Sequence, residues 1–90
     1  MPKILLPELF KKYTPDTLEY RVSGDTVYEC LRDLAAQCPP LEKKLFKAEG
    51  ELSATVIIYL DNRDIRMLEG GGTRVEPDST IRLLAALAGG

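Results

Sequence analysis

The residues best placed to do chemistry are the last two of the chain, Gly89 and Gly90, which end the stretch AALAGG. The carboxylate of Gly90 has no Cβ atom near it, so the backbone could enter a narrow channel that any side chain would block. Leu87 is the one large residue in this stretch and could act as an anchor, with Ala88 between it and the glycines. We therefore predict that residues 85–90 form a flexible tail that presents the Gly90 carboxylate to the active site of another protein.

Catalysis by the chain's own side chains has little support. The 90 residues include no histidine, so the commonest general base and metal ligand is missing. Cys30 and Cys38 are the only cysteines, and in one predicted helix they would stand about 12 Å apart along the axis, too far for a disulfide. Two cysteines on one helix do not make a zinc site either, so we interpret them as small buried residues. We predict no catalytic residue, no metal site and no enzyme.

Two further motifs have plain structural interpretations. The triple glycine at 70–72 could cradle a phosphate only if a helix began directly after it, and the following residues TRVEPDST predict none. It is interpreted as a loop. Asp61 and Asp64 flank a predicted tight turn, where such residues are favoured for backbone hydrogen bonding alone.

Composition predicts one globular domain over residues 1–90. The chain is 44% hydrophobic and 29% charged with a net charge of −2, and this balance argues against a nucleic-acid partner. No segment approaches the roughly 20 apolar residues needed to span a bilayer. The short apolar stretch near the start is interrupted by Pro2 and Pro7 and has no small-residue cleavage site after it. We therefore expect no membrane association and a cytoplasmic location.

The first half of the chain predicts two strands and a helix. Residues 3–6 form a short apolar run, and residues 18–23 alternate as a half-buried strand does. A helix is predicted to begin after Thr26, because Glu29 follows three residues later in a capping box, and to end at Pro39. Its apolar stripe consists of Val27, Leu31, Leu34 and Cys38.

The second half predicts a short second helical turn within residues 41–50, ended by Gly50, and then three strands. Its inward residues would be Leu41, Leu45 and Phe46. Residues 54–60 form a β-branched run, the sequence DNRD forms a turn, and residues 65–67 form a short returning strand. The last strand is predicted at 80–84, after a turn at EPDS. Two strands, a helix and three strands in this order predict a small α+β domain with one main helix packed across the sheet.

The strand alternation predicts a candidate docking surface. In residues 56–60 the odd-numbered side chains should point away from the helix, and in the last strand the even-numbered ones should do so. We call the resulting set the outer patch, and we predict that it meets a partner protein, because it combines apolar side chains with a charge. The alternative is that a loop or the second helical turn covers it. The outer patch consists of Ile57, Tyr59, Arg82 and Leu84.

The chain resembles the ubiquitin-like sulfur carriers, the MoaD and ThiS proteins, which also end on Gly-Gly. The resemblance covers essentially the whole chain and is most specific over residues 56–90, VIIYLDNRDIRMLEGGGTRVEPDSTIRLLAALAGG, with the helix opening GDTVYECL as a second match. It implies the β-grasp, a mixed sheet with a helix across it. Many MoaD proteins have Pro-Pro before the final Val-x-Gly-Gly, whereas this chain has Ala85 and Ala86, and Leu87 for the valine. Its tail is nearer to the CysO-type and archaeal MoaD-like members.

What the resemblance implies is a carrier. In the family, an E1-like adenylating enzyme of the MoeB/ThiF type uses ATP to activate the terminal carboxylate, and sulfur then replaces the adenylate to give a thiocarboxylate. Carried over, Gly90 would bear the adenylate and the sulfur, and the chain itself would bind no cofactor. A sulfhydrylase or synthase would accept the sulfur, for cysteine or homocysteine synthesis. The alternatives are the small subunit of molybdopterin synthase, a protein modifier joined to lysines through Gly90, and a plain interaction domain with an incidental tail.

Overall fold

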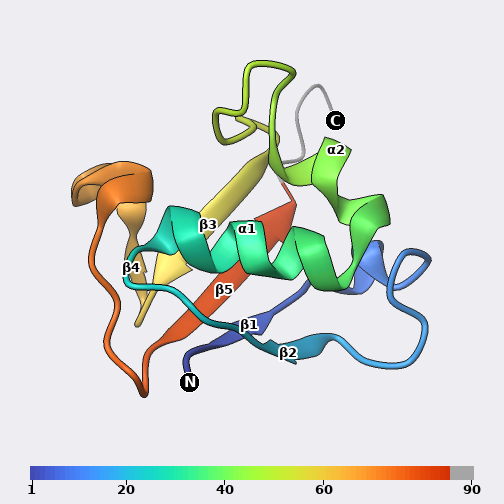
Figure 1. Ribbon diagram of the computed structural model, residues 1–90, viewed down its shortest axis with the longest axis horizontal. Helices are drawn as coiled ribbons and strands as arrows, with labels where there is room; N and C mark the ends of the chain where they lie inside the picture. Colours follow the sequence, from blue (N-terminus) through green and yellow to red (C-terminus); the bar gives the residue numbers. More distant parts are fainter. Residues whose placement is uncertain (86–90) are drawn as a thin grey trace.

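The computed structural model describes residues 1–85. It shows a five-stranded mixed sheet with one main helix across it (Figure 1). The strands run in the order β2-β1-β5-β3-β4, with β5 parallel to β1 and antiparallel to β3. The predicted α+β class and the order of elements are confirmed. The strands are β1 (Lys3–Leu5), β2 (Glu19–Arg21), β3 (Val56–Leu60), β4 (Arg63–Asp64) and β5 (Thr80–Ala85).

Helix α1 (Val27–Gln37) begins where the capping box predicts. The Thr26 hydroxyl oxygen accepts a hydrogen bond from the amide of Glu29 at 3.2 Å. The Glu29 carboxylate accepts in turn from the amide of Asp25 at 2.8 Å, one residue before the cap itself. Cys38 caps the other end, and a 3-10 turn at Pro39–Leu41 leads into α2 (Glu42–Leu45), the predicted second helical turn, which ends before Gly50.

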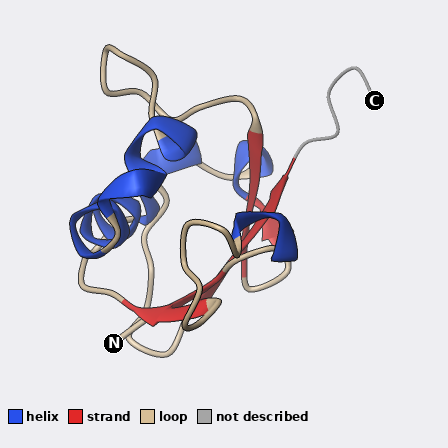
Figure 2. Ribbon diagram, turned by 90° about the vertical axis from the view of Figure 1, so that its right-hand side faces the viewer, coloured by secondary structure: helices blue, strands red, loops and turns tan. Residues whose placement is uncertain are grey.

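The core lies between α1 and the sheet. Ile4 of β1 and Ile81 of the central strand β5 are fully buried, as are Leu31 and Leu34 of α1. Figure 2 shows the longest helical segments on one side of the strands. All seven residues predicted to face inward from the two helical segments are buried: Val27, Leu31, Leu34, Cys38, Leu41, Leu45 and Phe46.

The predicted strand at Ile65–Met67 is wrong. The chain returns earlier, because Asp61 and Asn62 both adopt left-handed backbone conformations, with φ of 48° and 74°, and close a two-residue hairpin turn. Arg63 therefore pairs directly with Leu60, and β4 is Arg63–Asp64. Ile65–Met67 instead forms a 3-10 turn, which the Asp64 carboxylate caps by accepting a hydrogen bond from the Arg66 amide at 2.9 Å.

Smaller differences concern element ends. The triple glycine forms one 3-10 turn at Gly70–Gly72 rather than an open loop. The first two strands are shorter than predicted, although the Leu6 amide still donates to the Leu18 carbonyl at 2.8 Å. Strand β5 continues one residue beyond the predicted end, because Ala85 pairs with Val56. Among the helices of residues 1–85, none has the length and apolar character needed to cross a membrane.

Candidate functional site

The strand that leads to the C-terminus is the central strand of the sheet. Strand β5 is held along its length by β3 on one side and, over Thr80–Arg82, by β1 on the other. Its last residue, Ala85, is still paired with Val56. The predicted carrier residue Gly90 and the tail residues Leu87, Ala88 and Gly89 lie outside the described residues, so their roles remain predictions. What the structure provides is a firmly anchored base for them.

The outer patch lies on the sheet face opposite α1. Ile57 pairs with Leu84 and Tyr59 pairs with Arg82, so the four side chains form two adjacent cross-strand pairs. Their intervening neighbours are buried, whereas Leu84 is 39% exposed, Arg82 is exposed, and the other two are half-buried. The predicted face assignment is therefore confirmed, while the docking role stays a prediction.

Charges beside the outer patch are unevenly paired. The Arg66 guanidinium donates to both carboxylate oxygens of Asp64, with the shortest contact at 2.6 Å, and holds the pKa of that carboxyl below its usual range. Asp64 is the cross-strand neighbour of Tyr59. Arg82, by contrast, forms no ion pair with any group in residues 1–85. The centre of the outer patch thus presents an unneutralised guanidinium, which fits an acidic group on a partner.

Both thiols are buried and free, as interpreted from the sequence. The Cys38 Sγ donates to the Tyr13 carbonyl at 3.3 Å. Burial and, to a smaller extent, the nearby carboxylates of Asp33, Glu29 and Asp25 together raise the pKa of the Cys30 thiol to about 11. Neither the burial nor this pKa suits a nucleophilic cysteine.

We predict that iodoacetamide at mildly alkaline pH modifies neither thiol in the folded protein and both after denaturation. The free energy of unfolding should also fall as the pH rises from about 9 towards about 11, because the unfolded thiol loses its proton first. The loss is on the order of 2 kcal/mol. Intact mass after alkylation tests the first statement. For the second, Cys30→Ala should flatten this part of the pH–stability curve, and an unchanged curve would contradict it.

Comparison with known proteins supports the resemblance to the sulfur carriers, both in sequence and in fold. No family model matches the chain. The sulfur carrier protein CysO of Mycobacterium tuberculosis is 27% identical over 89 residues, which span 97% of this chain and 96% of the relative, and CysO of Mycobacterium bovis matches equally.

Three solved structures superpose closely. CysO in the Amycolatopsis orientalis BexX/CysO complex has a TM-score of 0.88 at 24% identity, covering all of both chains. Small archaeal modifier protein 1 of Methanosarcina acetivorans has a TM-score of 0.88 at 26% identity, covering 99% of this chain and 95% of that one. CysO of Mycobacterium tuberculosis has a TM-score of 0.85 at 24% identity, covering 97% and 100%.

The fold is that of the ubiquitin-like β-grasp proteins, as the resemblance implied. Together with the sequence match, this makes the chain similar to the ubiquitin-like, MoaD/ThiS-like sulfur carriers.

Proposed function

We propose that the chain carries sulfur as a thiocarboxylate on Gly90. The observation that carries this proposal is the similarity to CysO along nearly the whole chain, combined with the Gly-Gly ending. The architecture supports it, because the central strand β5 fixes the base of the tail at Ala85. The core and α1 lie on the face of the sheet opposite the outer patch. A rigid handle of this kind lets partner proteins hold the domain while they act on the terminus.

The proposed chemistry has two steps on the terminal carboxyl. A carboxylate oxygen of Gly90 attacks the α-phosphate of ATP in an E1-like adenylating enzyme, and pyrophosphate leaves. Hydrosulfide then attacks the acyl carbon, AMP leaves with the electron pair of the broken C–O bond, and loss of the sulfur-bound proton to solvent leaves the thiocarboxylate. Adenylation is needed because a carboxylate oxygen is a poor leaving group at neutral pH.

The proposed partners are the adenylating enzyme of the MoeB/ThiF type and an enzyme that accepts the sulfur. We favour a sulfhydrylase that makes cysteine or homocysteine, because the curated relatives are CysO proteins. The outer patch is the proposed contact with the adenylating enzyme, in the cytoplasm. A protein modifier is the second candidate, favoured by the superposition on small archaeal modifier protein 1. The small subunit of molybdopterin synthase is a third proposal, based on the resemblance alone.

Intact mass spectrometry tests the carrier proposal. Incubation with the cognate adenylating enzyme, ATP and a sulfide source should raise the mass by the sulfur-minus-oxygen difference. Fragmentation should place this gain on Gly90, and a chain without Gly90 should show none. Because Cys30 and Cys38 are buried, brief alkylation of the folded protein should label only the thiocarboxylate, and a Cys30→Ala, Cys38→Ala variant should be labelled equally.

The same assay separates the candidates. A modifier would appear in cells as conjugates of higher mass, with lysines of other proteins bearing a Gly-Gly remnant. Abundant conjugates without thiocarboxylate would move the assignment to the modifier class. Neither product in the presence of the cognate enzyme would overturn the carrier proposal.

A further inference from the structure

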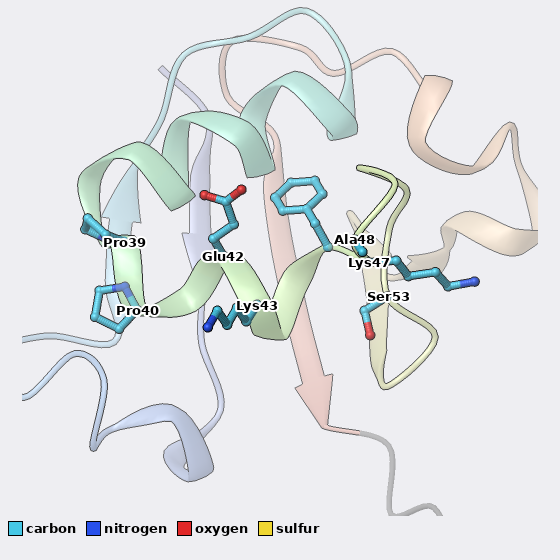
Figure 3. A pocket seen from close by; sticks show the side chains of 8 residues that line it. Pro39, Pro40, Glu42, Lys43, Lys47, Ala48 and Ser53 are labelled. Atoms are coloured by element: carbon cyan, nitrogen blue, oxygen red, sulfur yellow. The ribbon is translucent and has the colours of Figure 1, made fainter.

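A hollow of about 820 Å³ opens beside α2, between this helix and the turn that precedes β3 (Figure 3). We call it the α2 hollow. Pro39 and Pro40 line one end of it, Lys43 and Lys47 contribute their side chains, and Ser53 lies at the other end. The sequence analysis did not single it out, because its walls come from segments that meet only in the folded chain.

The walls of the α2 hollow are held in place by the side chain of Arg32 on α1. Its guanidinium lies 3.9 Å from the centroid of the Phe46 ring and donates to the Glu42 carboxylate at 3.4 Å. It also donates to the Tyr28 hydroxyl at 3.2 Å, and that hydroxyl donates to the Gly50 carbonyl at 2.6 Å. One cluster therefore ties α1, α2 and the following turn together, so the hollow is largely preformed.

The charged side chains of the α2 hollow that form no ion pair in the described part of the chain are positive. The carboxylate of its lining acid, Glu42, is engaged by Arg32. Lys43 and Lys47 are exposed, and neither forms an ion pair with a group in the described part of the chain. The acids of the adjoining turn, Glu49 and Glu51, do not line the hollow. Two free ammonium groups beside proline rings fit an acidic segment with apolar side chains.

The α2 hollow also lies close to the base of the tail. Ser53 stands three residues before Val56, and because residues 54–55 form a turn, the two Cα atoms are less than about 10 Å apart. Val56 pairs with Ala85, the last described residue of β5, at the ordinary strand spacing of about 5 Å. A protein that grips the terminal residues is therefore within reach of the hollow at the same time.

We propose that the α2 hollow is a second docking surface, which takes an acidic segment of the enzyme that adenylates Gly90. This inference rests on the proposed function. Two weak contacts on one partner, the tail in the active site and an acidic segment in the hollow, would reinforce each other, because the first raises the effective concentration of the second. The outer patch, on the opposite face of the sheet, is a separate proposed contact with the same enzyme.

The matched variants are two double charge reversals. Lys43→Glu with Lys47→Glu removes the positive charge of the α2 hollow. Lys11→Glu with Lys12→Glu makes the same net change at exposed lysines that do not line it. The first pair should weaken binding to the adenylating enzyme at least about tenfold and reduce its dependence on salt, whereas the second pair should change binding less than about threefold. Circular dichroism checks that both variants fold.

A peptide titration tests the hollow without relying on the proposed function. The probe is a short, capped peptide of alternating glutamate and leucine, added to ¹⁵N-labelled protein. Amide shifts should concentrate in residues 39–53 and should be lost in the Lys43→Glu, Lys47→Glu variant. Shifts spread over all lysine-bearing segments, or none, would overturn the inference. So would equal loss of enzyme binding in both double variants.

The outcomes for the inference and for the proposed function are distinct. If the wild-type chain gains no sulfur with its cognate enzyme, the carrier proposal fails, whatever the peptide does. If the wild type gains sulfur and the Lys43→Glu, Lys47→Glu variant gains it with unchanged affinity and rate, the carrier proposal stands and the docking role of the hollow fails.

Discussion

Replacing Gly89 with valine should reduce ATP-dependent activation of the chain at least about a hundredfold. A β-branched side chain next to the reacting carbonyl restricts the backbone and adds bulk where we predict a narrow channel. Small displacements of a reacting group are known to cost about this much in rate. The free energy of unfolding should stay within about 0.5 kcal/mol of the wild-type value, because the tail follows the last described residue of β5.

The measurement is the initial rate of pyrophosphate release with the cognate adenylating enzyme. Gly72→Val is the matched control, because a Cβ atom at Gly72 meets nothing within 4 Å and its backbone is not left-handed. This variant should be activated at the wild-type rate. Normal activation of Gly89→Val would contradict the narrow-channel argument, and a comparable loss in Gly72→Val would show that the assay reports folding instead.

The elements predicted correctly are those with a clear period. In β3 the side chains alternate between buried and half-buried, so a period of two was sufficient to assign both faces. In α1 the stripe at Val27, Leu31 and Leu34 has the helical period, and the capping box gave the helix start. In patterns of this length no single residue decides the assignment, which is why the predictions were reliable.

The misassigned segment, Ile65–Met67, is too short to carry a period. Its conformation depends on two local features, the left-handed pair Asp61 and Asn62 and the hydrogen bond from the Arg66 amide to Asp64. The sequence DNRD predicted a turn correctly, but the prediction that Asp61 and Asp64 flank it was wrong, because Asp61 and Asn62 form the bend and Asp64 belongs to β4. Shifting the bend moved the returning strand to Arg63–Asp64.

The α2 hollow could not be predicted because it depends on contacts between distant residues. Arg32 reaches Phe46 from α1, and Tyr28 reaches Gly50 across a separation of 22 residues. No local pattern encodes these pairs. The outer patch was predictable because the two strands that carry it, β3 and β5, are both long enough to show the alternation of inward and outward side chains. Grouping their outward residues then required only that the two strands be neighbours in the sheet.

Side chains along strand β5 point alternately to the core and to the outer patch, so packing and docking can be tested separately within one strand. Ile81 is fully buried beneath α1, whereas Leu84 is 39% exposed on the outer patch. Ile81→Ala should lower the free energy of unfolding by about 2–5 kcal/mol through the lost burial and the cavity left behind. Leu84→Ala should lower it by less than about 1 kcal/mol, yet weaken binding to the adenylating enzyme at least about tenfold.

Urea denaturation and a binding titration with the adenylating enzyme measure the two effects separately. Because a domain of this size has limited stability, Ile81→Val is the second core variant, with an expected loss of about 0.5–1.5 kcal/mol and unchanged binding. If Leu84→Ala costs as much stability as Ile81→Ala, the outer face is covered and cannot be a docking surface. If Leu84→Ala changes neither quantity, the enzyme contacts another surface. Stability loss confined to the inward residue, with binding loss confined to the outward one, is the result expected when one strand serves the core with one face and a partner with the other.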